Sequence, residues 1–176
     1  MELKYLTEKT LELFNVQNTD ELSGKLFETV KGNDRNSYHR FTMLVEGDLS
    51  VDWLQKIYQY YQADRKEKMQ DYTPKSLATF MGKLAGESKT VIDMCAGSGA
   101  LTIQKWNLNH DLEFVLYELD ENVIPYLLFN MAVRNISCAI HYADVLQMEI
   151  FKSYCIRKGE KYGIFEEMTN GNSIDI

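Results

Sequence analysis

The chain has 176 residues, of which 45% are apolar, with 10 glycines and 2 prolines, a composition typical of one globular domain with at most a small appendage. Its 19 basic and 26 acidic residues give a net charge of -7, so strong attraction to DNA through a generally basic surface is excluded. Only a local cluster such as Arg65, Lys66 and Lys68 departs from this acidic balance, and we expect contact with DNA to depend on a partner. The sequence contains no run of 18 apolar residues and no signal-peptide pattern at Met1–Lys4, which predicts a cytoplasmic protein that does not enter a membrane.

The first 70 residues are predicted to form a small helical N-terminal segment. Apolar residues recur at three-to-four spacing over 3–14, 22–30 and 51–61, whereas the polar stretch 31–37 reads as a loop. The last of these helices carries aromatic residues at helical spacing, and we favour packing over a base-stacking platform for this stripe of Trp53, Tyr58, Tyr60 and Tyr61.

From residue 71 to 176 the pattern changes to alternating helices and strands. Thr73 and Pro74 mark a helix start, and the apolar side chains that follow on one helix face are Leu77, Phe80, Met81 and Leu84. Strands are predicted over 90–93, 112–118, 137–141 and 161–165, with helices over 100–106 and 121–134. This alternation predicts a parallel sheet covered by helices on both faces.

Three strand ends carry residues suited to an adenosine-binding crevice. Gly97 and Gly99 allow close approach of a ligand to the backbone, and the helix that follows them offers free N–H groups. Glu118 ends the next strand, nineteen residues after Gly99, where an acidic side chain can accept hydrogen bonds from ribose hydroxyls. Asp144 lies near the end of the third strand, and the carboxyl ends of parallel strands converge on one crevice.

The cysteines and histidines predict no metal site. Cys95, Cys138 and Cys155 are odd in number and fit neither a disulfide framework nor a zinc motif, and the three histidines are scattered. We expect buried or idle thiols.

The segment Asp93–Gly99, with sequence DMCAGSG, resembles the first motif of S-adenosylmethionine-dependent amino-methyltransferases. Together with Asp71–Pro74 upstream, Glu118 and Ala143–Val145, it is similar to N6-adenine DNA methyltransferases, and most of all to the modification subunits of type I restriction-modification systems. The resemblance covers about residues 71–146. It implies an α/β fold, a truncated Rossmann-like methyltransferase domain over 71–176 preceded by the helical segment, with S-adenosyl-L-methionine as cofactor.

The resemblance also implies roles for individual residues. Those expected around the methionine part of the cofactor are Tyr72, Thr73, Asp93, Ala96 and Gly97, beside the turn residue Gly99. Glu118 would accept from the ribose, Leu119 would pack on the adenine ring and Asp144 would accept from the adenine amino group.

The family's catalytic motif, an Asn or Asp followed by two prolines and an aromatic residue, is missing. Prolines occur only at 74 and 125, and the sequence after the strand predicted over 161–165 is Glu166–Asn172. Asn170 or Asn172 is a weak substitute for the missing acceptor, so we assign no catalytic residue, and we expect the isolated chain to bind cofactor without methylating DNA.

Three functions remain open. The first is the cofactor-binding part of a DNA N6-adenine methyltransferase that acts on DNA with a specificity subunit or a second methyltransferase subunit. The second is a non-catalytic S-adenosylmethionine-binding or interaction module that modulates a modification system. The third is a small-molecule or protein methyltransferase with unusual acceptor chemistry.

Overall fold

A computed structural model describes residues 1–61, 75–84, 86 and 88–168. The elements follow in the order α1 (Leu3–Phe14), α2 (Leu22–Lys31), α3 (Arg35–Leu44), α4 (Trp53–Tyr61), α5 (Lys75–Leu84), β1 (Thr90–Asp93), α6 (Ala100–Leu108), β2 (Glu113–Glu118), α7 (Ile124–Val133), β3 (Cys138–Asp144), β4 (Glu149–Arg157) and β5 (Ile164–Met168). The α/β fold is therefore confirmed, and none of the described helices is long and apolar enough to cross a membrane.

The five strands form one sheet in the order β1-β2-β3-β4-β5. β1, β2 and β3 run parallel, with Val91 opposite Phe114 and Leu116 opposite Ile140. β4 pairs antiparallel with β3, and β5 pairs antiparallel with β4. The expectation of a parallel sheet was therefore wrong for the β3–β4–β5 part of the sheet. After Asp144 the chain reverses through a short turn and pairs β4, which was not predicted, back onto β3.

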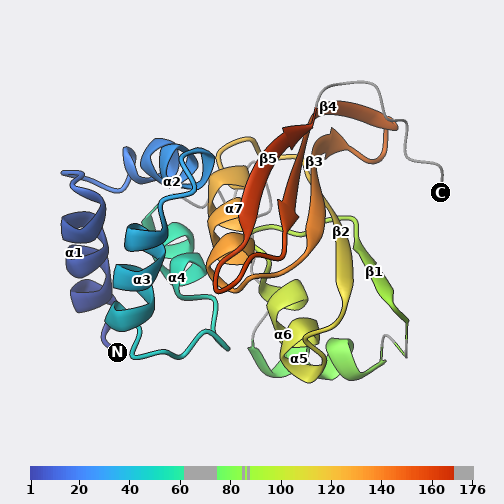
Figure 1. The fold of residues 1–176 in the computed structure, drawn as a ribbon, viewed down its shortest axis with the longest axis horizontal. Helices are drawn as coiled ribbons and strands as arrows, with labels where there is room; N and C mark the ends of the chain where they lie inside the picture. The colour runs from blue at the N-terminus through green and yellow to red at the C-terminus, as the bar shows by residue number, and fades with distance from the viewer. Residues whose placement is uncertain (62–74, 85, 87, 169–176) are drawn as a thin grey trace.

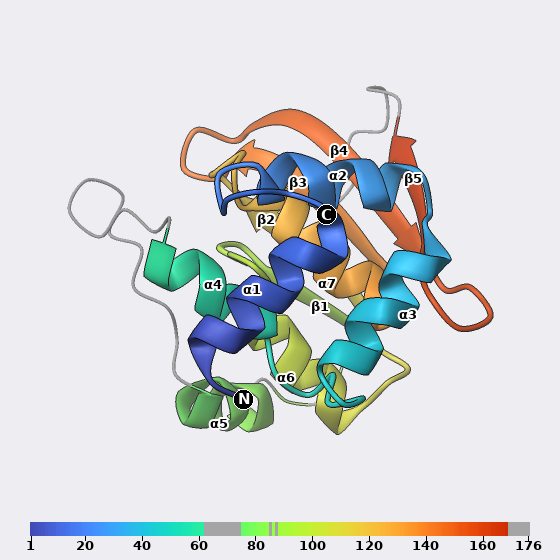
Figure 2. The ribbon, with the colours of Figure 1, turned by 90° about the vertical axis from the view of Figure 1, so that its left-hand side faces the viewer.

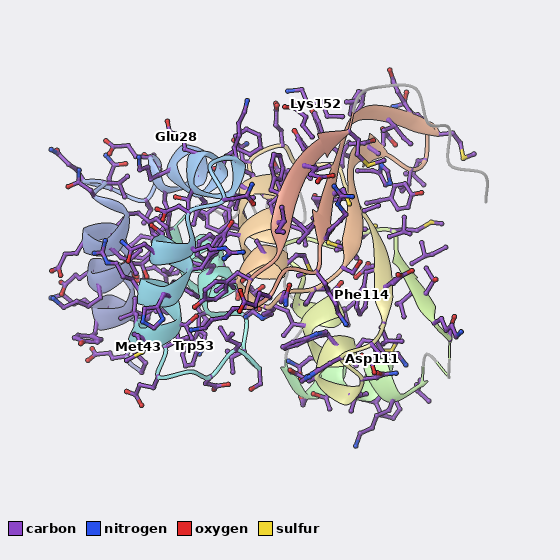
Figure 3. The ribbon with its side chains drawn as sticks, viewed as in Figure 1. Glu28, Met43, Trp53, Asp111, Phe114 and Lys152 are labelled. Atoms are coloured by element: carbon purple, nitrogen blue, oxygen red, sulfur yellow. The ribbon has the colours of Figure 1, made fainter. Side chains whose placement is uncertain are left out.

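Helix α7 lies between the sheet and the N-terminal helices, as both ribbon views show (Figures 1 and 2). It is buried along its whole length, and it contacts α2, α3 and α4 on one side and β3 and β4 on the other. Trp53, the first residue of α4, is buried and belongs to the core on the side of the N-terminal helices (Figure 3). The apolar side chains of the N-terminal helices and of the sheet thus form one continuous core.

α1, α2 and α4 follow the predicted apolar spacing, whereas α3 was not predicted from the sequence. α3 begins at Arg35, inside the stretch expected to be a loop, because the Asp34 carboxylate caps it by accepting hydrogen bonds from the N–H groups of Asn36 and Ser37. In α4, Trp53 and Tyr58 are buried as expected for packing, whereas Tyr60 and Tyr61 remain exposed.

The opposite end of the sheet is more open. α5 packs on α6 near β1, yet the apolar residues expected on one of its faces stay largely exposed, namely Leu77, Phe80, Met81 and Leu84. β1 pairs with β2 on one side, and no described strand pairs with its other edge.

Candidate functional site

The loop that joins β1 to α6 lies at the carboxyl ends of β1 and β2. The Ala96 N–H donates to the carbonyl of Tyr117 at 2.9 Å, which ties the loop to the end of β2. Gly97 and Gly99 have φ values of 56° and 99°, a backbone region that glycine adopts without strain. The predicted small-residue turn is therefore present where the sequence indicated it.

The φ of Gly99 disfavours any other residue, and side chains within the protein lie close to this position. A Cβ at this position would lie 2.7 Å from Cε of Met131 and 3.0 Å from Cδ1 of Leu127, both on α7. Side chains of α7 thus approach Gly99 from inside the protein, and its contact with a ligand stays a prediction.

Glu118, the last residue of β2, is hydrogen-bonded to the loop that follows β1. Its carboxylate accepts a hydrogen bond from the Gly97 N–H at 2.8 Å and one from the Asp120 N–H at 2.7 Å. A carboxylate oxygen has two acceptor positions, so each oxygen can take a further hydrogen bond from a hydroxyl group. The residue predicted to contact a ribose is thus fixed beside the glycine loop.

Asp93 ends β1 on the same edge of the sheet. Its Oδ1 accepts from the Cys95 N–H at 3.2 Å, and its Oδ2 lies 3.5 Å from the hydroxyl of Thr102. Ala96 is part of the loop itself and is buried.

The two carboxyl groups share an unusual electrostatic environment. Burial raises the pKa of Asp93 and of Glu118, although hydrogen bonds from backbone N–H groups oppose this change in both. Partial desolvation also raises the pKa of the exposed Cys95 thiol, and the nearby charges of Glu118 and Asp93 raise it further. Within the described part of the chain, neither carboxylate forms an ion pair with a basic side chain. The site is therefore a partly buried acidic pair suited to a ligand that carries a positive charge and hydroxyl groups.

Leu119 is adjacent to Glu118, whereas Asp144 lies further from the loop. The Leu119 side chain is 56% exposed directly after Glu118, so it offers an apolar surface next to that carboxylate. Asp144 is on β3, which is separated from β1 by β2, or by about 10 Å across two strand spacings. Its carboxylate accepts from the N–H groups of Leu146 and Gln147 and from the Gln147 side chain, and so stabilises the β3–β4 turn.

Several predicted residues need separate mention. Tyr72, Thr73, Asn170 and Asn172 lie outside the described residues. Cys138 is buried and Cys155 is half-buried, whereas Cys95 is exposed within the loop. No group of three His, Cys, Asp or Glu side chains in the described ranges is placed to hold a metal ion.

A buried polar cluster behind the loop was missed. Asp52, Ser98, Asn130 and Arg134 are hydrogen-bonded to one another, and all four are almost fully buried. The only local signal was an aspartate directly before the helix-forming Trp53, a helix-capping position.

Comparison with known proteins gives the family. The sequence profile of the N-6 DNA Methylase family matches residues 49–162, which include the loop, Asp93, Glu118, Asp144 and the buried polar cluster. No curated protein matches the chain. A similar solved structure is the type I restriction-modification system methyltransferase subunit from Streptococcus thermophilus, with 18% identity and a TM-score of 0.43 over 84% of this chain and 37% of that one. The chain thus spans little more than a third of that subunit, and by the profile match over most of its length it belongs to the N-6 DNA methylase family.

Proposed function

We propose that this chain is the S-adenosylmethionine-binding part of a DNA N6-adenine methyltransferase of the restriction-modification type. The observation that carries the proposal is the hydrogen bond between the Gly97 N–H and the Glu118 carboxylate, next to a second partly buried carboxylate at Asp93. Membership of the N-6 DNA methylase family supports the choice of cofactor.

The residues of the site fit this cofactor chemically. S-adenosylmethionine carries an amino group, a positively charged sulfonium and two ribose hydroxyls, and it supplies a methyl group for transfer to the adenine N6 amine. Asp93 is placed to neutralise a positive charge, and Glu118 has acceptor capacity left for ribose hydroxyls. Leu119 offers an apolar surface for the adenine ring. Tyr72 and Thr73 complete this proposed set from outside the described residues.

We further infer that methylation of DNA requires a partner chain, such as a specificity subunit or a second methyltransferase subunit. The sequence has no pair of adjacent prolines from which the family's acceptor motif could be built. The outer edge of β1 is unpaired in the described part of the sheet, with Ile92, Met94 and Met81 exposed beside it. An unpaired strand edge flanked by apolar side chains favours association with another polypeptide. The net charge of -7 also makes unaided DNA binding weak.

Substitution of Glu118 tests the cofactor site. We expect Glu118→Ala to weaken S-adenosylmethionine binding by about 1.5–3 kcal/mol, because hydrogen bonds to a charged carboxylate are lost. Equilibrium dialysis with labelled cofactor measures this change. Glu113→Ala is the matched control, because Glu113 is an exposed glutamate at the other end of the same strand. Equal affinity in wild type and Glu118→Ala would remove Glu118 from the site.

A methylation assay tests the need for a partner. We expect the purified chain to bind cofactor but to transfer no methyl group to adenine in duplex DNA, because acceptors for the adenine amine are missing. Adenine methylation by the chain alone would contradict this prediction. If modification-system subunits bind the chain without restoring methylation, the non-catalytic module becomes the better description.

A further inference from the structure

The loop Gly97–Gly99 is held on its inner side by the N-terminal segment. Asp52 precedes α4, and its Oδ2 accepts a hydrogen bond from the Ser98 hydroxyl at 2.7 Å. The two residues are 46 positions apart in the sequence, and they are 5% and 1% exposed. The Ser98 hydroxyl therefore points into the protein, away from solvent.

Asn130 on α7 strengthens the same contact. Its Nδ2 donates to Asp52 Oδ1 at 2.9 Å and to the Ser98 carbonyl at 2.8 Å. Both the side chain and the backbone of Ser98 are thus fixed. The N–H of Gln55 donates to Asp52 Oδ1 at 2.9 Å, so the aspartate caps α4 as well.

The segment that carries Asp52 is anchored to the same part of the fold. Arg134 donates to the carbonyls of Leu49 and Val51 at 2.8 and 2.7 Å, and it also donates to Asn130 Oδ1 at 2.8 Å. The carbonyl of Ser50 accepts from Gln104 and Asn107 of α6. Burial of Asp52 without a counter-charge would be costly, and Arg134 supplies that charge.

We infer that Asp52 is a positioning residue for the cofactor loop, acting through Ser98. The three loop residues are held by three different parts of the chain: Gly97 by Glu118 on β2, Ser98 by Asp52, and Gly99 by packing on α7. Without the hydrogen bond from Ser98 to Asp52, the loop spends a smaller fraction of the time in the conformation in which the Gly97 N–H donates to Glu118. The apparent cofactor affinity then falls in proportion to the remaining competent fraction. This inference rests on the proposed cofactor site.

Ser98→Ala is the first test, because it removes the hydroxyl and leaves the α4 cap and Arg134 in place. We expect hydrogen exchange at the amides of Gly97 and Gly99 to become about tenfold faster in the ligand-free chain, while amides in the middle of α7 keep their rates. We expect affinity for S-adenosylmethionine to fall about three- to tenfold. A purely structural role would instead raise exchange throughout the core.

Two further variants make the test specific. Asp52→Asn changes a residue outside the loop, and it should produce the same faster exchange at Gly97 and Gly99 and the same loss of affinity, together with faster exchange at the α4 cap. Asn107→Ala is the matched control, because Asn107 also binds the Ser50 carbonyl but does not contact the loop. Its affinity should stay within about twofold of wild type.

The outcomes separate this inference from the proposed function. The wild type could bind the cofactor while Ser98→Ala and Asp52→Asn show the same affinity and the same exchange rates as the wild type. This result would overturn the positioning role of Asp52 and leave the proposed function in place. Absence of binding by the wild type would overturn the proposed function, and the exchange rates of Gly97 and Gly99 would still decide whether Asp52 orders the loop.

Discussion

Helices α7 and α5 differ sharply in burial, although each is next in sequence to a strand that carries residues of the candidate site. α7 follows β2 and is buried on every side, between the sheet and the N-terminal helices. α5 precedes β1 and packs on α6, but it leaves Phe80 57% exposed. Stability is therefore concentrated on the α7 side, whereas the α5 and β1 side has apolar surface available for other contacts.

The same contrast applies to polar groups. On the α7 side, the carboxylate of Asp52 is buried and accepts three hydrogen bonds, and the nearby charge of Arg134 favours its ionised form. At the strand ends, Asp93 and Glu118 are partly buried carboxylates whose hydrogen bonds come mainly from backbone N–H groups. The first arrangement maintains structure, and the second leaves acceptor capacity for a ligand.

The largest expected effect sharpens the contrast in packing. Phe129 of α7 is fully buried and makes edge contacts with Phe14, Tyr38 and Phe41 at centroid distances of 5.1–5.5 Å. Phe129→Ala should lower the free energy of unfolding by about 4 kcal/mol, through lost burial and a residual cavity. Urea denaturation measures the change. Phe80→Ala in α5 is the control, with an expected change within about 0.5 kcal/mol. Equal losses in the two variants would break the comparison.

An intermediate effect concerns pH. Burial raises the pKa of Asp93 and of Glu118, so both become protonated at a higher pH than exposed carboxyl groups do. Protonation removes the negative charge that a cationic ligand requires, and cofactor affinity should fall as the pH is lowered from neutral toward the ordinary carboxyl range. Calorimetric titrations across this range measure the dependence. Glu118→Gln should reduce it, and affinity that stays constant would contradict the role of these carboxylates.

The same pKa shifts have a second consequence for the ligand-free chain. A carboxyl group with a raised pKa binds protons more readily in the folded than in the unfolded state. These two groups therefore favour folding as the pH falls from above the raised pKa toward the ordinary carboxyl range, and they oppose it as the pH rises through the same window.

The smallest expected effect concerns Asp144. Its carboxylate is engaged by the β3–β4 turn, so a contribution to adenine binding adds to an existing structural role. Asp144→Ala should weaken cofactor binding by about 0.5–1.5 kcal/mol, as for one hydrogen bond. Equilibrium dialysis measures it, with Glu149→Ala as control, because Glu149 is its exposed partner across the hairpin. Wild-type affinity in Asp144→Ala would exclude the aspartate from the site.

The sequence predicted those parts of the fold whose signals are local. The ends of β1 and β2, the glycine turn and the start of α6 follow from apolar runs and from residues with special backbone preferences. The N-6 DNA methylase family match confirms the resemblance based on these residues.

Features that depend on distant contacts were not predictable. β4 was missed because most of its first half is exposed, and the turn before it contains no glycine or proline, although Met148 adopts a φ of 58°. Asp52 appears in the sequence only as a helix cap, since its partners Ser98 and Asn130 follow 46 and 78 residues later. The exposure of α5 depends on which surfaces the rest of the chain leaves uncovered, and helical periodicity alone does not determine this.

Calorimetric titration of the wild-type chain with S-adenosylmethionine and S-adenosylhomocysteine tests the central claim most directly. The site built from Asp93, Gly97 and Glu118 predicts binding in the micromolar range, with a weakened interaction in Glu118→Ala. Absence of binding at millimolar ligand would contradict the assignment of a cofactor site to this chain.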